Sequence, residues 1–398
     1  MIAPMKKSLL PAFALLALSA LPASAASFQS CLAAIGARAQ AAGVSPSVFA
    51  RQTNGLQPDM TVIDAMNKQP EFKTAIWDYM AGLVDAQRVA DGKQMMSKYA
   101  SVLAGVQRRY GVDPATVVAV WGVESNYGES PGTRPLVQSL ATLSCYGGRR
   151  QGYFMGELIA TLKIIQRGDV NPDHLVGSWA GAFGNTQFMP STFLRLAVDG
   201  DGDGRRDVVD SVPDALASTA NYLAHSGWQP GARWGYEVRL PASFKPGLAG
   251  RTKKRPLSSW ASMGVTRIDG SALSGGGSAA ILLPAGPRGP AFVVFRNFDV
   301  IYSYNAAESY ALAIANLSDR IKGGGPIVTP WPTEDPGLSR AQRKELQALL
   351  IRSGYDVGTP DGSIGDKTIE AIKSAQRRLG LPVTGHPGVQ ILQALRKG

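Results

Sequence analysis

The sequence predicts a mainly helical protein of the α+β class, in which an α domain carries a small β-rich insert and is followed by a compact helical module. Three observations support this prediction. Residues 28–228 show helical periodicity that is interrupted by Gly and Pro. Residues 235–300 change to short apolar runs of strand character, bounded by Ser and Gly. A Gly- and Pro-rich stretch at 323–337 then separates a last patterned segment from the rest.

The first 25 residues have the pattern of a secretory signal peptide. Lys6 and Lys7 precede a Leu- and Ala-rich run from Leu9 to Leu21, and small residues at 23–25 provide a cleavage site. The run is short for a membrane span, and no other segment is apolar enough to form one. We therefore expect an exported protein that does not span the membrane and that works in the periplasm.

Cys31 and Cys145 are the two cysteines of the chain. In an oxidising compartment such a pair is more often a disulfide than two free thiols, so we expect a bond between them. The alternative is that both are small buried hydrophobic side chains.

The chain of 398 residues carries a net charge of +11, and removal of Lys6 and Lys7 with the signal leaves +9. A basic exported protein suits nucleic acid, acidic lipid or an anionic polymer such as peptidoglycan. The positive charges are dispersed, and the single run of three is Lys253-Lys254-Arg255. Aromatic residues do not alternate with basic ones as they do in a surface that binds nucleic acid. We therefore expect no nucleic-acid partner.

A buried helix is expected between Asp113 and Gly128. Asp113 can act as its N-cap, Pro114 suits the first helical position, and Gly128 can end it. Most residues between them are apolar, so Glu124 lies in the last turn of a largely buried element. Apolar surroundings raise the pKa of a carboxyl group, which suits a general acid acting on a glycosidic oxygen. The alternative is a surface Glu near a helix end.

The segment 177–191 is rich in small residues and carries the polar side chains of Ser178, Asn185 and Gln187. Glycines allow a backbone to approach a ligand closely. Hydroxyl and amide groups suit the hydroxyl and acetamido groups of sugars. The alternative is a tight turn that enters a helix capped near Ser191.

Residues 199–210 have the spacing of a calcium-binding loop, with acidic residues at positions 1, 3, 5, 9 and 12 and Gly at position 6. Position 12 is Asp, which is shorter than the usual Glu. The alternative is a solvated acidic turn, and no organic cofactor is expected. The expected ligands of a structural Ca²⁺ are the carboxylates of Asp199, Asp201, Asp203 and Asp210 and the backbone carbonyl of Arg205.

Together these motifs resemble the lytic transglycosylase B group, whose members cleave the glycan strands of peptidoglycan. The resemblance covers about residues 28–322. It rests on Val-Glu-Ser-Asn-Tyr-Gly at 123–128, on the segment 178–191, on the acidic loop and on Tyr304-Asn305. It implies a lysozyme-like α domain with a calcium loop and a small β domain, in which Glu124 is the single catalytic carboxylate.

The resemblance also implies roles for residues around Glu124. The positions that match binding sites for the sugar or the intermediate are Ser178, Gln187 and Asn305. The positions that match groove-lining residues are Tyr79, Arg149, Arg150, Tyr153, Tyr304 and Tyr310. The chain departs from the family pattern at Asn185-Thr186, where a Tyr-Gly type pair is more usual, and at Arg205-Arg206. The first departure predicts altered sugar contacts, and the second predicts weaker metal binding.

Residues 338–398 resemble the peptidoglycan-binding type 1 domain, a small three-helix module. Its marks are Gly354-Tyr355-Asp356, the segment 361–368 and the segment 375–382. The expected organisation is therefore a signal peptide at 1–25, a catalytic region at 26–322, a flexible linker at 323–337 and a wall-binding module at 338–398. The apolar residues that mark two of its helices are Leu346, Leu349 and Leu350, and then Ile369, Ile372, Ala375 and Leu379.

We therefore expect a lytic transglycosylase that cleaves the β-1,4 bond between N-acetylmuramic acid and N-acetylglucosamine and leaves 1,6-anhydromuramic ends. Its partner is peptidoglycan, and enzymes of wall synthesis or remodelling are further expected partners. Two alternatives stay open. A lysozyme-type muramidase would hydrolyse the same bond, and a non-catalytic protein would only bind the wall.

Overall fold

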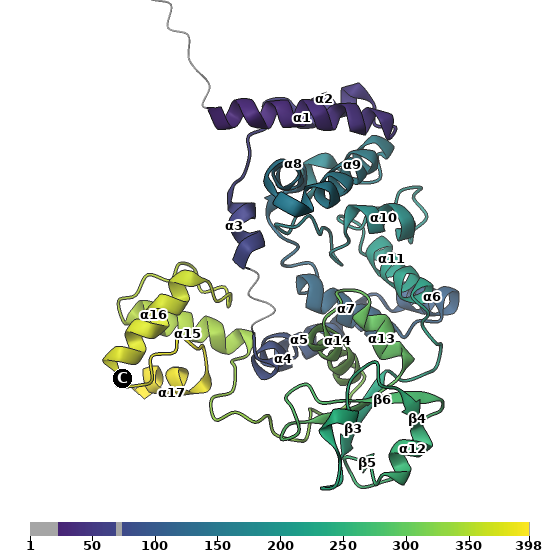
Figure 1. The fold of residues 1–398 in the computed structure, drawn as a ribbon, viewed down its shortest axis with the longest axis vertical. Helices are drawn as coiled ribbons and strands as arrows, with labels where there is room; N and C mark the ends of the chain where they lie inside the picture. The colour runs from purple at the N-terminus through teal and green to yellow at the C-terminus, as the bar shows by residue number, and fades with distance from the viewer. Residues whose placement is uncertain (1–22, 69–73, 398) are drawn as a thin grey trace, which may run out of the picture.

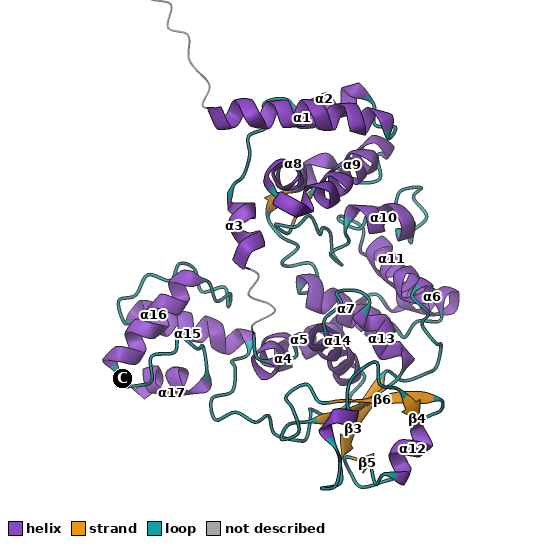
Figure 2. Cartoon of the chain, viewed as in Figure 1, coloured by secondary structure: helices purple, strands orange, loops and turns teal. Residues whose placement is uncertain are grey.

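The computed structural model describes residues 23–68 and 74–397, so most of the signal peptide expected at 1–25 lies outside the described residues. The chain is mainly helical, with a five-stranded sheet at one end and a separate group of three helices at the C-terminus (Figures 1 and 2). A two-stranded sheet, β1 (Arg134–Pro135) with β2 (Val176–Gly177), lies between the helices. Among the residues described, no helix combines the length and the apolar character that a membrane crossing requires.

The first helical lobe begins with the first described residues and has its own hydrophobic core. Phe28, Leu140, Phe154 and Phe193 are completely buried in it. Cys31 and Cys145 form the predicted disulfide, which joins the first helix to the end of α8 across a Cα–Cα distance of 5.9 Å. The helices of this lobe are α1 (Ala23–Ala41), α2 (Pro46–Thr53), α3 (Thr61–Lys68), α8 (Leu136–Tyr146), α9 (Gln151–Arg167) and α10 (Pro190–Leu196).

The second helical lobe has a separate core, to which Val118, Trp121, Phe298 and Leu312 contribute. The two cores meet at Tyr222, which packs against both of them. The helices of this lobe are α4 (Ile76–Leu83), α5 (Ala86–Lys98), α6 (Ala100–Tyr110), α7 (Pro114–Ser125), α11 (Val212–His225), α13 (Arg296–Tyr302) and α14 (Glu308–Ile321).

Helix α7 begins where the sequence predicts and ends earlier. Asp113 Oδ1 accepts the N–H of Ala115 at 3.2 Å, and Pro114 occupies the first turn. The helix ends at Ser125, because Asn126 adopts the left-handed conformation with φ of 52°. Asn tolerates this conformation better than most residues, so it replaces the Gly that the prediction used as the stop.

The β-rich insert is a five-stranded sheet in which every neighbouring pair is antiparallel, in the order β4-β6-β7-β3-β5. Strands β6 and β7 have apolar side chains buried on both faces of the sheet. One face packs on the core of the second lobe, and the other packs on a small core that contains Trp260. Helix α13 falls inside the range predicted as β-rich. The elements of the insert are β3 (Gly235–Arg239), β4 (Arg255–Pro256), α12 (Leu257–Ser262), β5 (Thr266–Arg267), β6 (Ser278–Leu282) and β7 (Ala291–Val294).

The C-terminal module consists of α15 (Arg340–Arg352), α16 (Asp366–Arg378) and α17 (Val389–Lys397) around a small core of its own. Residues 323–337 form neither helix nor strand, as their composition predicts. They are nevertheless held along their length. The N–H groups of Val328 and Thr329 donate to the Glu237 carboxylate of β3 at 2.7 and 2.8 Å.

The module itself is docked on helix α4. His386 Nε2 lies 3.0 Å from Asp78 Oδ2, and His386 Nδ1 lies 3.0 Å from Asp335 Oδ2. Arg343 of α15 donates to the backbone carbonyl of Asp78 at 3.3 Å. The linker, which the sequence predicts to be flexible, and the module therefore both make polar contacts with the rest of the chain, and the module lies beside α4 (Figure 1).

Candidate active site

Glu124 lies in the last turn of α7, where the two helical lobes meet. Its side chain is partly exposed, and its Oε1 accepts a hydrogen bond from the hydroxyl of Tyr310 on α14. Burial raises the pKa of Glu124 from 4.5 to about 7, although the bond from Tyr310 acts in the opposite direction. The carboxyl group can therefore be present in both protonation states near neutral pH.

Aromatic rings form one wall beside Glu124. The rings of Tyr304 and Tyr310 stack with centroids 6.4 Å apart, and the ring of Tyr222 lies 4.7 Å from that of Tyr304. Burial, followed by the charge of Glu124, raises the pKa of Tyr310 far above its usual value, with Tyr304 and Tyr79 contributing further. Tyr310 therefore remains a hydrogen-bond donor throughout the range in which Glu124 titrates.

The segment that carries Ser178 and Gln187 is a tight turn leading into α10. Its backbone is therefore the turn into a helix that the sequence analysis gave as the alternative to a sugar-binding segment. The Ser178 N–H donates to the Ala182 carbonyl at 2.8 Å. Gln187 has a φ of 51°, and its Nε2 donates to the carbonyls of Pro131 and Gly184 at 2.7 and 2.9 Å. These bonds occupy the donor side of the Gln187 amide and leave its Oε1 as an acceptor.

The turn is fastened to the aromatic wall. The hydroxyl of Tyr304 donates to the backbone carbonyl of Thr186 at 2.8 Å. Ser178 and Gln187 are partly exposed, and Asn305, next to Tyr304, is exposed. Of the predicted site residues, the structure thus brings Glu124, Tyr304 and Tyr310 into one cluster and ties the Gln187 turn to it.

Of the remaining predicted groove residues, Tyr79 lies on α4 of the second lobe, whereas the other three lie in the first lobe. Arg149 and Arg150 precede α9, and Tyr153 lies in its first turn, with all three side chains exposed. The guanidinium of Arg150 lies 5.4 Å from the centre of the Tyr153 ring. Figure 1 places α9 in the first lobe and α7 in the second, so these side chains belong to the opposite lobe from Glu124.

Asn185 has a structural role that the sequence does not reveal. Its Oδ1 accepts the indole N–H of Trp121 at 3.0 Å, and its Nδ2 donates to the carbonyls of Val208 and Val209 at 3.2 and 2.8 Å. Its own carbonyl accepts the hydroxyl of Ser125 at 2.5 Å. The side chain is buried. Asn185 therefore ties the end of α7 to the acidic loop, and its side chain is not available for the altered sugar contacts that we expected there.

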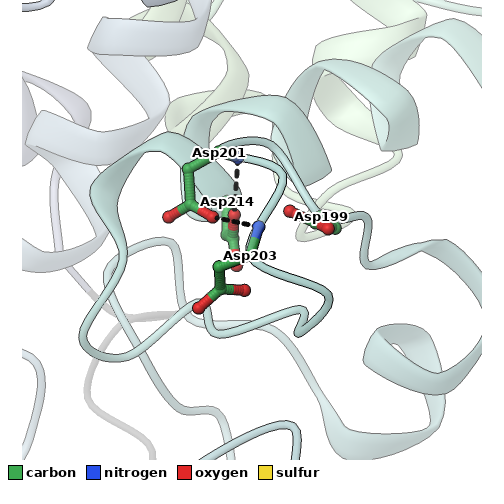
Figure 3. Close-up of side chains that lie close together, drawn as sticks. All are labelled: Asp199, Asp201, Asp203 and Asp214. Atoms are coloured by element: carbon green, nitrogen blue, oxygen red, sulfur yellow. Dashed lines mark hydrogen bonds between the residues drawn. The ribbon is translucent and has the colours of Figure 1, made fainter.

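The acidic loop gathers four carboxylates whose ligand atoms lie within 4.8 Å of one another, from Asp199, Asp201, Asp203 and Asp214 (Figure 3). The spacing places Asp210 in this group, but Asp210 Oδ2 lies 2.7 Å from His174 Nδ1 instead. Asp214 replaces it from the first turn of α11, outside the twelve-residue pattern.

These carboxylates fit a hard cation such as Ca²⁺, because all of them offer oxygen atoms. Burial raises the pKa of Asp214, and a bound cation would offset that cost. The adjacent arginines behave differently from each other. Arg205 pairs with Asp203 at 3.0 Å, whereas Arg206 turns away to Asp169. Arg205 would therefore compete with a bound cation for the carboxylate of Asp203.

The family can be stated from a comparison with known domains. A model of the transglycosylase SLT domain matches residues 27–319. The chain belongs to this family. Members of the transglycosylase SLT family are lytic transglycosylases, and this chain is accordingly an enzyme that cleaves glycosidic bonds of peptidoglycan. A model described as a putative peptidoglycan binding domain matches residues 339–395.

Individual family members agree with this assignment. Membrane-bound lytic murein transglycosylase B of Escherichia coli strain K12 is 33% identical over 267 residues, which cover 64% of this chain and 70% of the relative. The structure of SltB3 from Pseudomonas aeruginosa with NAG-anhNAM-pentapeptide is 48% identical, covers 93% of this chain and 99% of its own, and has a TM-score of 0.75. Escherichia coli Slt35 with calcium is 28% identical over 74% of this chain and 92% of its own, with a TM-score of 0.64. The predicted family and fold class are confirmed.

Proposed function

We propose that Glu124 is the single acid and base of this transglycosylase and that the products carry 1,6-anhydromuramic ends. The observation that supports this is a partly exposed carboxyl group whose pKa is raised to about 7 beside a tyrosine donor. An ordinary glycosidase places two carboxylates around the bond that it breaks. Burial and Tyr310 set the pKa of Glu124, and no carboxylate among the described residues adds to them.

The proposed reaction has two proton transfers through the same side chain. Protonated Glu124 gives its proton to the glycosidic oxygen as the bond from that oxygen to C1 breaks, while the substrate's 2-acetamido group stabilises the positive charge at C1. The Glu124 carboxylate then takes the proton of the C6 hydroxyl, and O6 bonds to C1. Glu124 is again protonated, and no water is consumed. The Tyr310 hydroxyl stabilises the carboxylate between the two steps.

Sugar-binding roles are proposed for three polar side chains, those of Ser178, Gln187 and Asn305. Gln187 would accept a hydrogen bond from the sugar through Oε1, because its Nε2 is already held by two carbonyls. Ser178 and Asn305 would bind the glycan through their hydroxyl and amide groups. Groove-lining roles are proposed for Tyr79, Arg149, Arg150, Tyr153 and Tyr304.

The proposed substrate is peptidoglycan with its peptide stems, reached in the periplasm after export. Support comes from SltB3, whose structures are complexes with NAG-NAM-pentapeptide and NAG-anhNAM-pentapeptide. We assign catalysis to residues 26–322 and wall binding to residues 338–398. Enzymes of wall synthesis or remodelling remain proposed partners.

A structural Ca²⁺ in the acidic loop is also proposed. It is supported by the four converging carboxylates and by the calcium complex of Slt35. The ion would hold the loop in shape, and the loop in turn contacts Asn185 beside α7. No chemical step is assigned to it.

Mass spectrometry of fragments released from purified sacculi tests the reaction. Wild-type enzyme should release fragments with 1,6-anhydromuramic ends, and Glu124→Gln should lower the rate by about 10²–10⁴-fold or more, because it removes the transferable proton and keeps the shape. Reducing muramic ends would instead identify a lysozyme-type hydrolase.

A further inference from the structure

A cavity lies between the second helical lobe and the C-terminal module, outside the cluster around Glu124. It has a volume of about 260 Å³ and is lined by α5, by the loop after α7 and by the first residues of α15. Asn126 and Glu129 of its lining follow Glu124 closely in sequence. The cavity is therefore adjacent to the end of the catalytic helix.

Two positively charged side chains of this cavity make no ion pair or side-chain hydrogen bond among the described residues, although the charge of Asp85 acts on one of them, Arg88. Arg88 of α5 is 6% exposed, and its Nε and Nη1 atoms are fully buried without a hydrogen-bond partner. Burial lowers the pKa of Arg88, which shows the cost of this environment. Lys344 of α15 is exposed on the opposite side of the cavity, and none of the ion pairs found in the described chain involves it.

The acidic side chains of the cavity, in contrast, already have donors. Asp85 Oδ1 accepts the N–H of Arg88 at 2.9 Å, and Asp91 Oδ1 accepts the side-chain amide of Gln87 at 2.8 Å. Glu129 Oε2 accepts the amide of Asn126 and lies 3.5 Å from Arg340 Nη1. The groups left to bind something are thus cationic, so the chemistry of the cavity favours an anion.

We propose that this cavity binds a carboxylate of a peptide stem while the glycan lies at Glu124, an inference that rests on the proposed substrate. A guanidinium binds a carboxylate with two parallel hydrogen bonds, and such charge-assisted bonds are strong where water is excluded. Arg88 is also connected to the catalytic helix, because its carbonyl accepts the hydroxyl of Tyr127 at 2.8 Å. The C-terminal module would then contribute to substrate selection through Lys344.

The test compares two substrates with the full-length enzyme: glycan strands that carry peptide stems and the same strands after an amidase has removed them. Formation of 1,6-anhydromuramic ends is measured for each, and the ratio of the two kcat/KM values is the readout. Arg88→Met and Lys344→Gln should each lower this ratio, by roughly tenfold for Arg88, which is the scale of a lost charged hydrogen bond. Lys373→Gln on α16 is the matched control and should leave the ratio unchanged.

A ratio that stays at the wild-type value in both variants would overturn the proposal. Arg88→Met removes a buried charge without a hydrogen-bonding partner, so its melting temperature should not fall. If it does not fold, Lys344→Gln decides alone, because Lys344 is exposed. A wild-type enzyme that makes no anhydro ends from either substrate would refute the proposed reaction instead, which is a separate result.

Discussion

Two opposing effects, burial and a hydrogen bond from Tyr310, set the pKa of Glu124. Burial alone would keep the carboxyl protonated well above its usual pKa, and the Tyr310 hydroxyl brings the pKa back toward neutrality by stabilising the carboxylate. A residue that must first give and then take a proton works best when its pKa is near the pH of the reaction. In the proposed reaction, Tyr310 would therefore tune the acid–base group through this hydrogen bond.

Tyr310→Phe should move the pH dependence of catalysis. The acid form of Glu124 is required, so wild-type activity should fall as the pH rises through about 7. Removing the hydrogen bond raises the pKa of Glu124, and this alkaline limb should move upward by about one pH unit or more. Profiles of kcat against pH measure it. Tyr304→Phe is the control, because its hydroxyl donates to the Thr186 carbonyl and not to Glu124.

Asn185→Asp should affect both stability and turnover. The substitution keeps the shape of the side chain but places an acceptor against the carbonyls of Val208 and Val209. We expect the free energy of unfolding to fall by about 1–3 kcal/mol and kcat to fall with it, because the end of α7 loses its anchor. Urea unfolding and kinetics measure the two effects. Asn67→Asp, at an exposed position of α3, should change neither, and equal effects of both substitutions would contradict the role of Asn185.

At the scale of elements, local sequence signals predicted those helix and strand features that depend on residues close together in the sequence. Asp113 and Pro114 predicted the start of α7, and short apolar runs bounded by Ser and Gly predicted the β-rich insert. The role of Asn185 could not be predicted, because its partners are 64 residues before it and 23 and 24 residues after it. Asp214 was missed for a related reason, since a fixed loop spacing does not include the first turn of the following helix.

Calcium binding by the acidic loop can distinguish the ligand set expected from the sequence, with Asp210, from the set that the structure brings together, with Asp214. Millimolar Ca²⁺ should raise the melting temperature of the wild-type protein by a few degrees over chelator, because an ion bound only to the folded state stabilises it. Asp214→Asn should reduce that shift, whereas Asp210→Asn should retain most of it. Differential scanning calorimetry measures both. A shift that survives Asp214→Asn and disappears in Asp210→Asn would restore the ligand set expected from the sequence.

At the scale of the whole molecule, docking of the C-terminal module depends on His386. Its hydrogen bond to Asp78, with a second one to Asp335, raises the pKa of His386 to about 9. A raised histidine pKa stabilises the docked state fully below the ordinary value of 6.5, and the contribution disappears as the pH rises through about 9.

The radius of gyration from small-angle X-ray scattering should therefore increase between pH 6 and pH 10 for the full-length protein. His386→Gln should remove most of this pH dependence, because a neutral side chain replaces the titrating one. His225→Gln on α11 is the matched control and should behave as the wild type does. A radius that is the same at both pH values in the wild type would show that Arg343 and the linker contacts hold the module without His386.

The attachment of residues 323–337 to Glu237 has a consequence for how the enzyme meets the wall. A loose tether lets a catalytic site search every bond within its reach, and the reach sets the local concentration of substrate. Here polar contacts with Glu237 and Asp78 hold the linker and the C-terminal module against the rest of the chain. While these contacts last, the fold sets the distance between the module and Glu124.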